Sequence, residues 1–394
     1  MDEPAAKMRP LTRRRWLGEA LAFAGWPAIL RALEPGEEPV PFADDGEFQP
    51  EVHAASPRVR CFDLRRLQGP ITPIGEFFVF HQTTAPRVDA AAWRLEIAGL
   101  VERPGVFTLA DLARIAGEKR EFEFTLECAG NLPRPEIMQG QVGNARWTGF
   151  SLPAILQHCG VKPEAREAVF FGADQVRDSA GVAHGPHARS VFVQDVLASD
   201  ALLATHMNGE VLPVEHGFPL RLILPGWYGM AQIKWLTRIE FIDRRYEGPH
   251  MSRNYHTLHV LPATGREPIV LETSISKTRL KSVVARIARR RLGRGWSYRV
   301  IGAAWGGAAP IERVEVSVDG GTWQPAQIDE RRGKHAWVLW SVPALELSPG
   351  RHTVTSRAID ARGAVQPSAE AWQKGIRSAR ENNAQWERVI VIPG

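Results

Sequence analysis

The chain has 394 residues, of which 44% are hydrophobic and 24% are charged, so it is long enough to form two globular cores. Its net charge of +5 suits anionic ligands, but no zinc-finger, helix-turn-helix or RNA-binding signature accompanies that charge, and nucleic acid is not an expected partner. The three cysteines include no C-x-x-C pair, which excludes an encoded iron–sulfur cluster, attached haem or a dense disulfide framework. Cys61 and Cys159 are predicted to be buried free thiols, with a disulfide between them as the alternative.

Residues 1–35 are predicted to form a targeting segment. Arg13 and Arg14 precede an aromatic residue and a leucine, which is the order found in twin-arginine export signals. Proline and charged residues interrupt the apolar stretch that follows, so it is too short for a transmembrane span and no stable membrane anchor is expected. Export by the twin-arginine route would place the protein in the periplasm, and an amphipathic N-terminal helix is the alternative.

Residues 36–265 are predicted to form an α+β domain. Residues 93–99 alternate apolar and polar side chains, which is strand periodicity. Thr108 and Asp111 have the spacing of an N-cap and its capping acid, which predicts a helix that begins after Thr108. A second helix is expected over residues 152–158, ended by Gly160. Short strands and helices then alternate as far as about residue 243.

Residues 266–394 are predicted to form an all-β domain. Short alternating runs cover residues 299–305, 311–318, 337–340, 352–360 and 388–392, and turn sequences such as Asp319-Gly320-Gly321 separate them. Evenly spaced strands of this kind are typical of an immunoglobulin-like sandwich.

A basic cluster falls within this second domain. No acidic residue occurs between Lys277 and Glu312, whereas cations cluster there, among them Lys281, Arg286, Arg289, Arg290, Arg291 and Arg294. The simpler interpretation is a solvated surface. The functional one is a docking patch for an acidic or haem-exposing electron acceptor, which would depend steeply on salt.

Cys128 is the most informative single residue. It ends a strand-like run and is followed by Ala129-Gly130-Asn131, and a thiolate in such a turn suits a soft metal. An isolated cysteine more often packs as a small hydrophobic residue, so further motifs are needed. Two lie downstream, at residues 143–149 (GNARWTG) and 216–221 (HGFPLR). With these motifs, the chain from about residue 71 onward resembles the sulfite oxidase family of molybdenum-cofactor (molybdopterin) oxidoreductases, in its bacterial sulfite or sulfane dehydrogenase-like form without a haem domain.

The resemblance implies a cofactor and a set of site residues. A sulfite-oxidase-type molybdopterin-binding domain would precede the sandwich, which in the family mediates homodimerisation. Cys128 would ligate molybdenum, and the remaining cofactor contacts would be His81, Asp174, His216, Arg221 and Lys234. Trp147 and Tyr255 would lie near the metal, and Arg388 is a further candidate from the second domain.

Two departures from the family pattern bear on the substrate. Phe80 stands where the family has a substrate-facing arginine, and Leu132-Pro133-Arg134 follows the cysteine motif where many members carry two arginines. Arg134 is predicted to replace part of the missing positive charge. Because charge-assisted bonds supply much of the affinity for an anion, a pocket with fewer cations should bind sulfite less well.

The predicted function is that of a periplasmic molybdenum oxidoreductase. It would transfer an oxygen atom to or from a small sulfur compound, in the manner of a sulfite dehydrogenase, and pass electrons to an external cytochrome c. Two alternatives stay open. The first is a sulfoxide reductase or sulfane dehydrogenase of the same family, and the second is a non-catalytic subunit that keeps the molybdopterin-binding fold.

Overall fold

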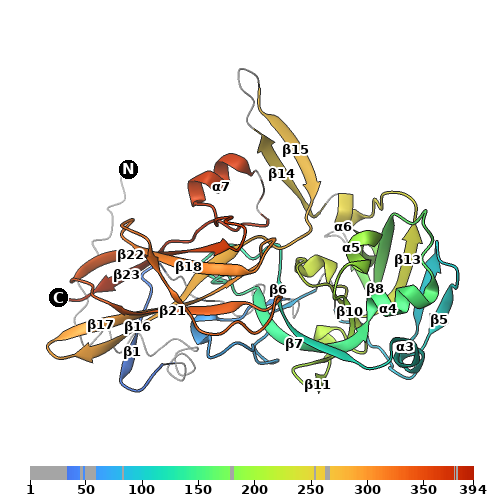
Figure 1. Cartoon of the computed structure of the whole chain (residues 1–394), viewed down its shortest axis with the longest axis horizontal. Coiled ribbons are helices and arrows are strands. Elements are labelled where there is room, and N and C mark those ends of the chain that lie inside the picture. Colours follow the sequence, from blue (N-terminus) through green and yellow to red (C-terminus); the bar gives the residue numbers. More distant parts are fainter. Residues whose placement is uncertain are drawn as a thin grey trace, which may run out of the picture.

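The computed structural model describes residues 33–44, 48, 59–81, 84–177, 182–252, 254–261, 267–376, 378 and 380–394. Nearly all of the predicted targeting segment, including Arg13 and Arg14, therefore lies outside the described residues. Within the described part, no helix is both long enough and apolar enough to cross a membrane. Two strand-rich domains lie side by side, and a two-stranded hairpin projects from the junction between them (Figure 1).

The first domain is built on two sheets. Their strands are β4 (Leu95–Gly99), β5 (Gly105–Phe107), β6 (Arg120–Glu127), β7 (Val142–Ser151), β8 (Glu167–Arg177), β9 (Ala183–Phe192), β10 (Leu202–Met207), β11 (Glu210–Val211), β12 (Arg221–Ile223) and β13 (Leu236–Ile242). One sheet has the order β5-β4-β13-β8-β9, and the other has the order β11-β10-β7-β6 with β12 paired to β10. The short strands β2 (Val59–Arg60) and β3 (Val79–Phe80) pair separately.

The helices of this domain are short and follow local sequence signals. Helix α3 (Leu109–Ala116) begins with the predicted capping box, in which Thr108 and Asp111 satisfy each other's backbone N–H groups. Helix α4 (Leu152–Cys159) ends at Gly160, whose φ of 69° lies in the left-handed region that glycine tolerates. Both predicted helices are thus confirmed. The remaining helices are α5 (Val193–Leu197), α6 (Pro249–Ser252) and the 3-10 turns η1 (Leu64–Arg66), η2 (Val214–His216) and η3 (Gly229–Ala231).

The second domain consists of two facing sheets. Its elements are β1 (Glu37–Val40), β16 (Lys281–Leu292), β17 (Gly295–Trp305), β18 (Ile311–Val318), β19 (Gln324–Pro325), β20 (Gln327–Ile328), β21 (Val338–Leu345), β22 (Gly350–Asp360), α7 (Ala369–Gly375) and β23 (Arg388–Ile392). The sheets run β1-β16-β17-β21-β20 and β19-β18-β22-β23, and a core that includes Ile287, Val314 and Ile390 fills the space between them. All five predicted strands are confirmed. The immunoglobulin-type topology stays a prediction.

The structure confirms the solvated surface only for part of the basic cluster, since Arg291 and Arg294 are exposed while other members are paired or buried. The docking patch stays a prediction. Strand β1 pairs with β16 and brings acidic side chains to it, so that Arg289 binds Glu38 at 3.0 Å and Arg290 binds Glu34 at 2.6 Å. Arg286 is buried and donates to backbone carbonyls. Much of the positive charge is therefore neutralised within the chain, by residues that precede the cluster by about 250 positions.

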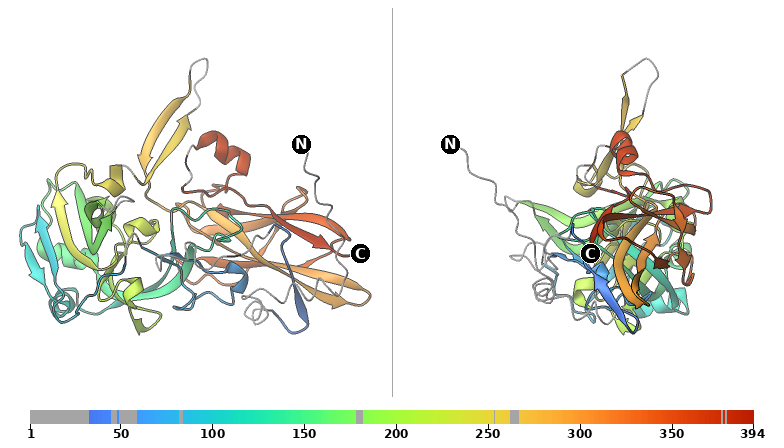
Figure 2. Two further views of the ribbon diagram at one scale, coloured as in Figure 1. Left: turned by 180° about the vertical axis from the view of Figure 1, so that it is seen from behind. Right: turned by 90° about the vertical axis from the view of Figure 1, so that its left-hand side faces the viewer.

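Two other features concern the cysteines and the hairpin. Cys61 and Cys159 are buried and unpaired, as predicted. The hairpin consists of β14 (His256–Leu261) and β15 (Ile269–Ser274), and both views of Figure 2 show it extending away from the two domains.

Candidate cofactor-binding site

Cys128 follows the last residue of β6, where the strand turns away from the sheet. Its backbone N–H donates to Gln141 O at 2.9 Å, and the Gly130 N–H points at Cys128 Sγ from 3.4 Å. A Cβ added at Gly130 would lie 3.8 Å from that sulfur, which is ordinary van der Waals contact. Cys128 is half-buried and faces a cavity.

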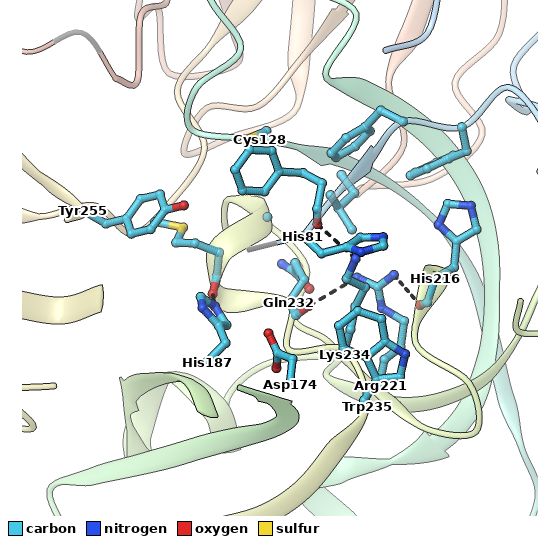
Figure 3. A pocket seen from close by; sticks show the side chains of 16 residues that line it. His81, Cys128, Asp174, His187, His216, Arg221, Gln232, Lys234, Trp235 and Tyr255 are labelled. Carbon is cyan, nitrogen blue, oxygen red and sulfur yellow. Dashed lines mark hydrogen bonds between the residues drawn. The ribbon is translucent and has the colours of Figure 1, made fainter. Parts of the chain in front are cut away.

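The cavity lies between the two sheets of the first domain and encloses about 720 Å³ of empty space, which includes space open to solvent. Figure 3 shows side chains from η2, η3 and several strand ends converging on it. The lining residues are Phe77, Phe78, Phe80, His81, Leu126, Cys128, Asp174, His187, His216, Arg221, Gly229, Met230, Gln232, Lys234, Trp235 and Tyr255.

One end of the cavity is cationic. Arg221 is buried and donates to His216 O at 2.8 Å and to Gln232 O at 3.3 Å, while its guanidinium lies 4.8 Å from the centre of the Trp147 ring. Lys234 Nζ donates to Phe80 O at 3.0 Å and to Glu215 O at 3.1 Å. These hydrogen bonds end on neutral carbonyls, so the two positive charges are solvated by dipoles and do not form a contact ion pair in the described residues.

Because the cations are buried, the cationic end of the cavity is suited to bind an anion. Burial lowers the pKa of Arg221 to about 9 and the pKa of Lys234 well below its usual range, which means that each charge is short of stabilisation. Arg221 Nε and His216 Nε2 are buried without a hydrogen-bond partner. An unsatisfied buried donor is costly, and a phosphate could accept from Arg221 Nε. The donor set therefore fits the phosphate of a pyranopterin.

Asp174 supplies the acidic group of the cavity. Its side chain folds over Gly172, where an added Cβ would lie 2.4 Å from Asp174 Oδ1 and 2.9 Å from Lys234 O. Burial raises the pKa of Asp174, and the nearby Lys234 acts in the opposite direction. A carboxylate here could accept hydrogen bonds from the amino and ring N–H groups of a pterin.

Residues from both domains surround the end of the cavity near the thiol. Burial raises the pKa of Cys128 to about 11, although the Gly130 N–H and the charges of Arg380 and Lys281 favour the thiolate. Tyr255 lines the cavity, and the Arg380 guanidinium lies 4.6 Å from the centre of its ring. A soft metal placed here would have to displace the thiol proton, after which the thiolate could act as its ligand.

The structure brings together seven of the predicted site residues: His81, Cys128, Asp174, His216, Arg221, Lys234 and Tyr255. Their individual roles stay predictions. Phe80, which replaces a family arginine, also lines the cavity.

Three further candidates lie elsewhere. Trp147 is fully buried in the core behind Arg221 and does not line the cavity. Arg134 is exposed and is not among the lining residues, so it adds no cation to the wall. Arg388 is buried in the second domain, where it binds Asp44 Oδ2 at 3.0 Å.

Sequence reasoning missed several lining residues and one neighbouring cation. His187, Met230 and Gln232 belong to no motif that carries chemistry by itself, although Gln232 organises the wall by bonding to Leu224 N and Trp227 O. Arg380 comes from the C-terminal segment, and only the folded structure places it over Tyr255. No local pattern in the sequence marks these residues.

Comparisons with known proteins match this geometry. Residues 81–250 match the model of the oxidoreductase molybdopterin-binding domain, and residues 272–393 match that of the Mo-co oxidoreductase dimerisation domain. The crystal structure of the sulfane dehydrogenase SoxCD from Paracoccus pantotrophus is similar, with a TM-score of 0.72 and 28% identity over 88% of this chain and 90% of that chain.

Curated relatives include plant nitrate reductases. Nitrate reductase [NADH] 2 of Phaseolus vulgaris is 30% identical over 353 residues, which are 81% of this chain and 38% of that protein. Nitrate reductase [NAD(P)H] of Hordeum vulgare is 30% identical over 357 residues, which are 82% of this chain and 37% of that protein. The chain thus spans less than two fifths of the length of these relatives.

The fold, the thiol and the cationic pocket together define a molybdopterin-binding oxidoreductase. More narrowly, the chain belongs to the sulfite oxidase family of molybdenum-cofactor enzymes, as its motifs predicted. The residues present fit that cofactor, since Cys128 could hold the metal and the cationic end with His216, Arg221 and Lys234 could hold the phosphate.

Proposed function

We propose that this protein transfers an oxygen atom to or from a small sulfur compound. The observation that carries the proposal is the pairing, in one cavity, of the Cys128 thiol with buried cations that form no contact ion pair within the described part of the chain. When bound there, the molybdenum cofactor would supply two-electron oxygen-atom transfer. The chain's own residues would orient the cofactor and shape the space beside the metal.

The apolar lining of the cavity and the few cations near the thiol favour a weakly charged sulfur substrate. Phe77, Phe78, Phe80, Leu126 and Met230 make much of the lining apolar. Because Arg134 is exposed, the positive charge near Cys128 comes from Arg380 and from Lys281, which is engaged by Glu127. A sulfite dianion would gain few charge-assisted bonds there, whereas a thiol-linked sulfane or a sulfoxide would fit the apolar wall.

A sulfane dehydrogenase-like reaction is therefore the second candidate within the same chemistry. It is supported by Phe80 in the cavity wall and by the likeness to a structure that is described as a sulfane dehydrogenase. The nitrate reductase relatives make nitrate a further compound to test. A non-catalytic subunit remains the alternative outside this chemistry.

The setting of the reaction forms part of the proposal. Arg13 and Arg14 support export by the twin-arginine route to the periplasm, where a separate cytochrome c would accept the electrons. The match of residues 272–393 to a dimerisation domain supports a homodimer.

The first test is the molybdenum-to-protein ratio of the purified full chain. We expect a ratio near one, a collapse of that ratio in Cys128→Ser, and little change in the control Cys159→Ser, whose thiol is buried away from the cavity. Single-turnover reduction with sulfite, a thiol-bound sulfane, dimethyl sulfoxide and nitrate would then identify the substrate class. A ratio near zero, from a host that loads another molybdenum enzyme, would favour the non-catalytic alternative.

A further inference from the structure

A pair of histidines lies at a side of the cavity that the expected cofactor contacts leave unused. His187 of β9 lines the cavity near Tyr255, on the side away from His216 (Figure 3). His250 of α6 does not line the cavity and is only 2% exposed, and the centres of the two imidazole rings are 4.5 Å apart. The pair therefore connects the cavity wall to a buried side chain behind it.

Hydrogen bonding fixes the tautomer of His187. Its Nε2 lies 3.0 Å from Met230 O, and because a carbonyl oxygen can only accept, Nε2 carries the ring proton. Nδ1 of the neutral ring is then a lone pair, and it is buried without a hydrogen-bond partner in the described part of the chain. A lone pair in this position can take up a proton.

Further nitrogen atoms around the pair also lack hydrogen bonds. Both ring nitrogens of His250 are buried without a partner among the described residues. The same holds for Nε of Arg189, whose other two nitrogens donate to the carbonyls of His250 and Ile275. Buried polar atoms of this kind would be costly in a dry site, and a water molecule needs two to four polar partners. Ordered water is therefore the expected bridge between the two rings.

The surroundings of the pair keep both rings neutral at physiological pH. Burial lowers the pKa of His187 to about 4 and the pKa of His250 to about 3, so a proton that reaches either ring is passed on and not retained. The charged and titratable groups that face the pair are Asp174, His184, Arg189, Lys234, Tyr255 and Arg380. Of these, His184 is exposed and its charge acts on His250, so the solvent beside His184 is the nearest outlet for a proton.

We propose that His187 and His250 relay protons between the cavity and the solvent beside His184. The inference rests on the proposed function, because oxygen-atom transfer with water as the oxygen source must move protons. One sulfur atom and one water molecule give an oxygenated sulfur, two protons and two electrons, and the electrons pass to the one-electron acceptor. Each proton passes to His187 Nδ1, crosses the bridging water to one nitrogen of His250 and leaves from the other. Reduction of a sulfoxide would use the same path inward.

The first test separates the two halves of the reaction in the cofactor-loaded full chain. Reduction of the protein by its sulfur substrate needs no proton outlet, whereas reoxidation with water does. We therefore expect His250→Ala to be reduced at the wild-type rate but to release protons at least tenfold more slowly on reoxidation, as followed by a pH indicator in weak buffer. Added imidazole can occupy the space left by the ring and should restore most of that loss.

The control is His352→Ala, which removes a buried histidine from the second domain and should match the wild type with and without imidazole. If no sulfur compound reduces the wild type, the proposed function fails and the relay fails with it. If the wild type is reduced but His250→Ala releases protons at the wild-type rate, only the relay is refuted. A slowing that imidazole does not restore would assign His250 a packing role and would also refute the relay.

A second measurement uses the wild type alone and decides the matter even if His250→Ala loses its molybdenum. In a chain with isotope-labelled histidines, nuclear magnetic resonance should show His187 protonated on Nε2 and the ring proton of His250 exchanging with water within milliseconds. A proton on His187 Nδ1, or a His250 ring proton that exchanges over minutes as in a dry core, would overturn the relay.

Discussion

Replacing Lys281 by Met should destabilise the junction between the two domains. Lys281 Nζ lies 2.5 Å from Glu127 Oε1, and the two side chains are 1% and 0% exposed. Glu127 also accepts from Asn131 Nδ2 at 3.0 Å and from Trp305 Nε1 at 2.8 Å. Methionine has nearly the shape of the lysine stem, so the substitution removes the charge and leaves most of the packing in place.

The expected loss follows from the burial of the pair. Removing one partner of a buried ion pair typically costs about 3–5 kcal/mol, because the other charge stays buried without compensation. The two neutral donors to Glu127 remain, and each contributes about 1 kcal/mol, so we expect a value near the lower end of that range. In the double variant Glu127→Gln/Lys281→Met, no charge is stranded. The double variant should therefore lose less stability than the sum of the two single variants.

The assay is urea unfolding followed by tryptophan fluorescence, since Trp305 lies in the junction. Lys374→Met is the matched control: Lys374 pairs with Glu370 at 2.6 Å, but both side chains are about three-quarters exposed. Exposed helical pairs of this kind contribute only about 0.3–0.5 kcal/mol. If Lys281→Met costs no more than Lys374→Met, the buried pair does not hold the domains together and the reasoning fails.

Two further substitutions test the cavity and its pH dependence. Gly172→Ala should lower the molybdenum content of the protein, because the added Cβ would lie 2.4 Å from Asp174 Oδ1 and displace that carboxylate. The control is Gly69→Ala, whose added Cβ would have no heavy atom within 4 Å. Equal molybdenum-to-protein ratios in the two variants would contradict a role for Asp174 in the cavity. His250 is buried with both ring nitrogens unpartnered, and burial lowers its pKa to about 3, so the unfolded chain binds more protons and stability falls as pH drops below about 6.5. Between pH 7 and pH 5 the wild type should lose up to about 2 kcal/mol of unfolding free energy through His250, and His250→Phe should not show this loss. The measurement is the urea midpoint of both proteins across that pH range. If the two midpoints change in parallel, His250 is not the cause.

The parts of the fold that the sequence predicted are those that depend on local signals. The capping box of Thr108 and Asp111 and the stop at Gly160 involve neighbouring residues, so propensity and geometry agree there. The strands of the second domain alternate because one face meets a core. The pairing of β1 with β16 involves residues about 250 positions apart, and no local pattern could indicate that Glu34 and Glu38 would neutralise the basic cluster.

The same division holds for the site. The motifs around Cys128 and from His216 to Arg221 place residues that are close in sequence, and the structure gathers them in one cavity. Arg134 stands next to the position of a missing arginine in the sequence, but the turn after Cys128 leaves it exposed. The cation that does lie near the thiol, Arg380, comes from a segment about 250 residues away.

The contributions of the two domains to the cavity are unequal, and this inequality has a chemical meaning. The cationic end is built from first-domain residues, because His216, Arg221 and Lys234 all come from η2, β12 and the approach to β13. The thiol end depends on the second domain, which supplies Lys281 to Glu127 and Arg380 to Tyr255. Cys128 lies directly after Glu127, so movement of the second domain would disturb the thiol and the wall beside it before it disturbed the cationic contacts. The second domain can in this way set the geometry of the thiol end, while the first domain alone holds the cationic end.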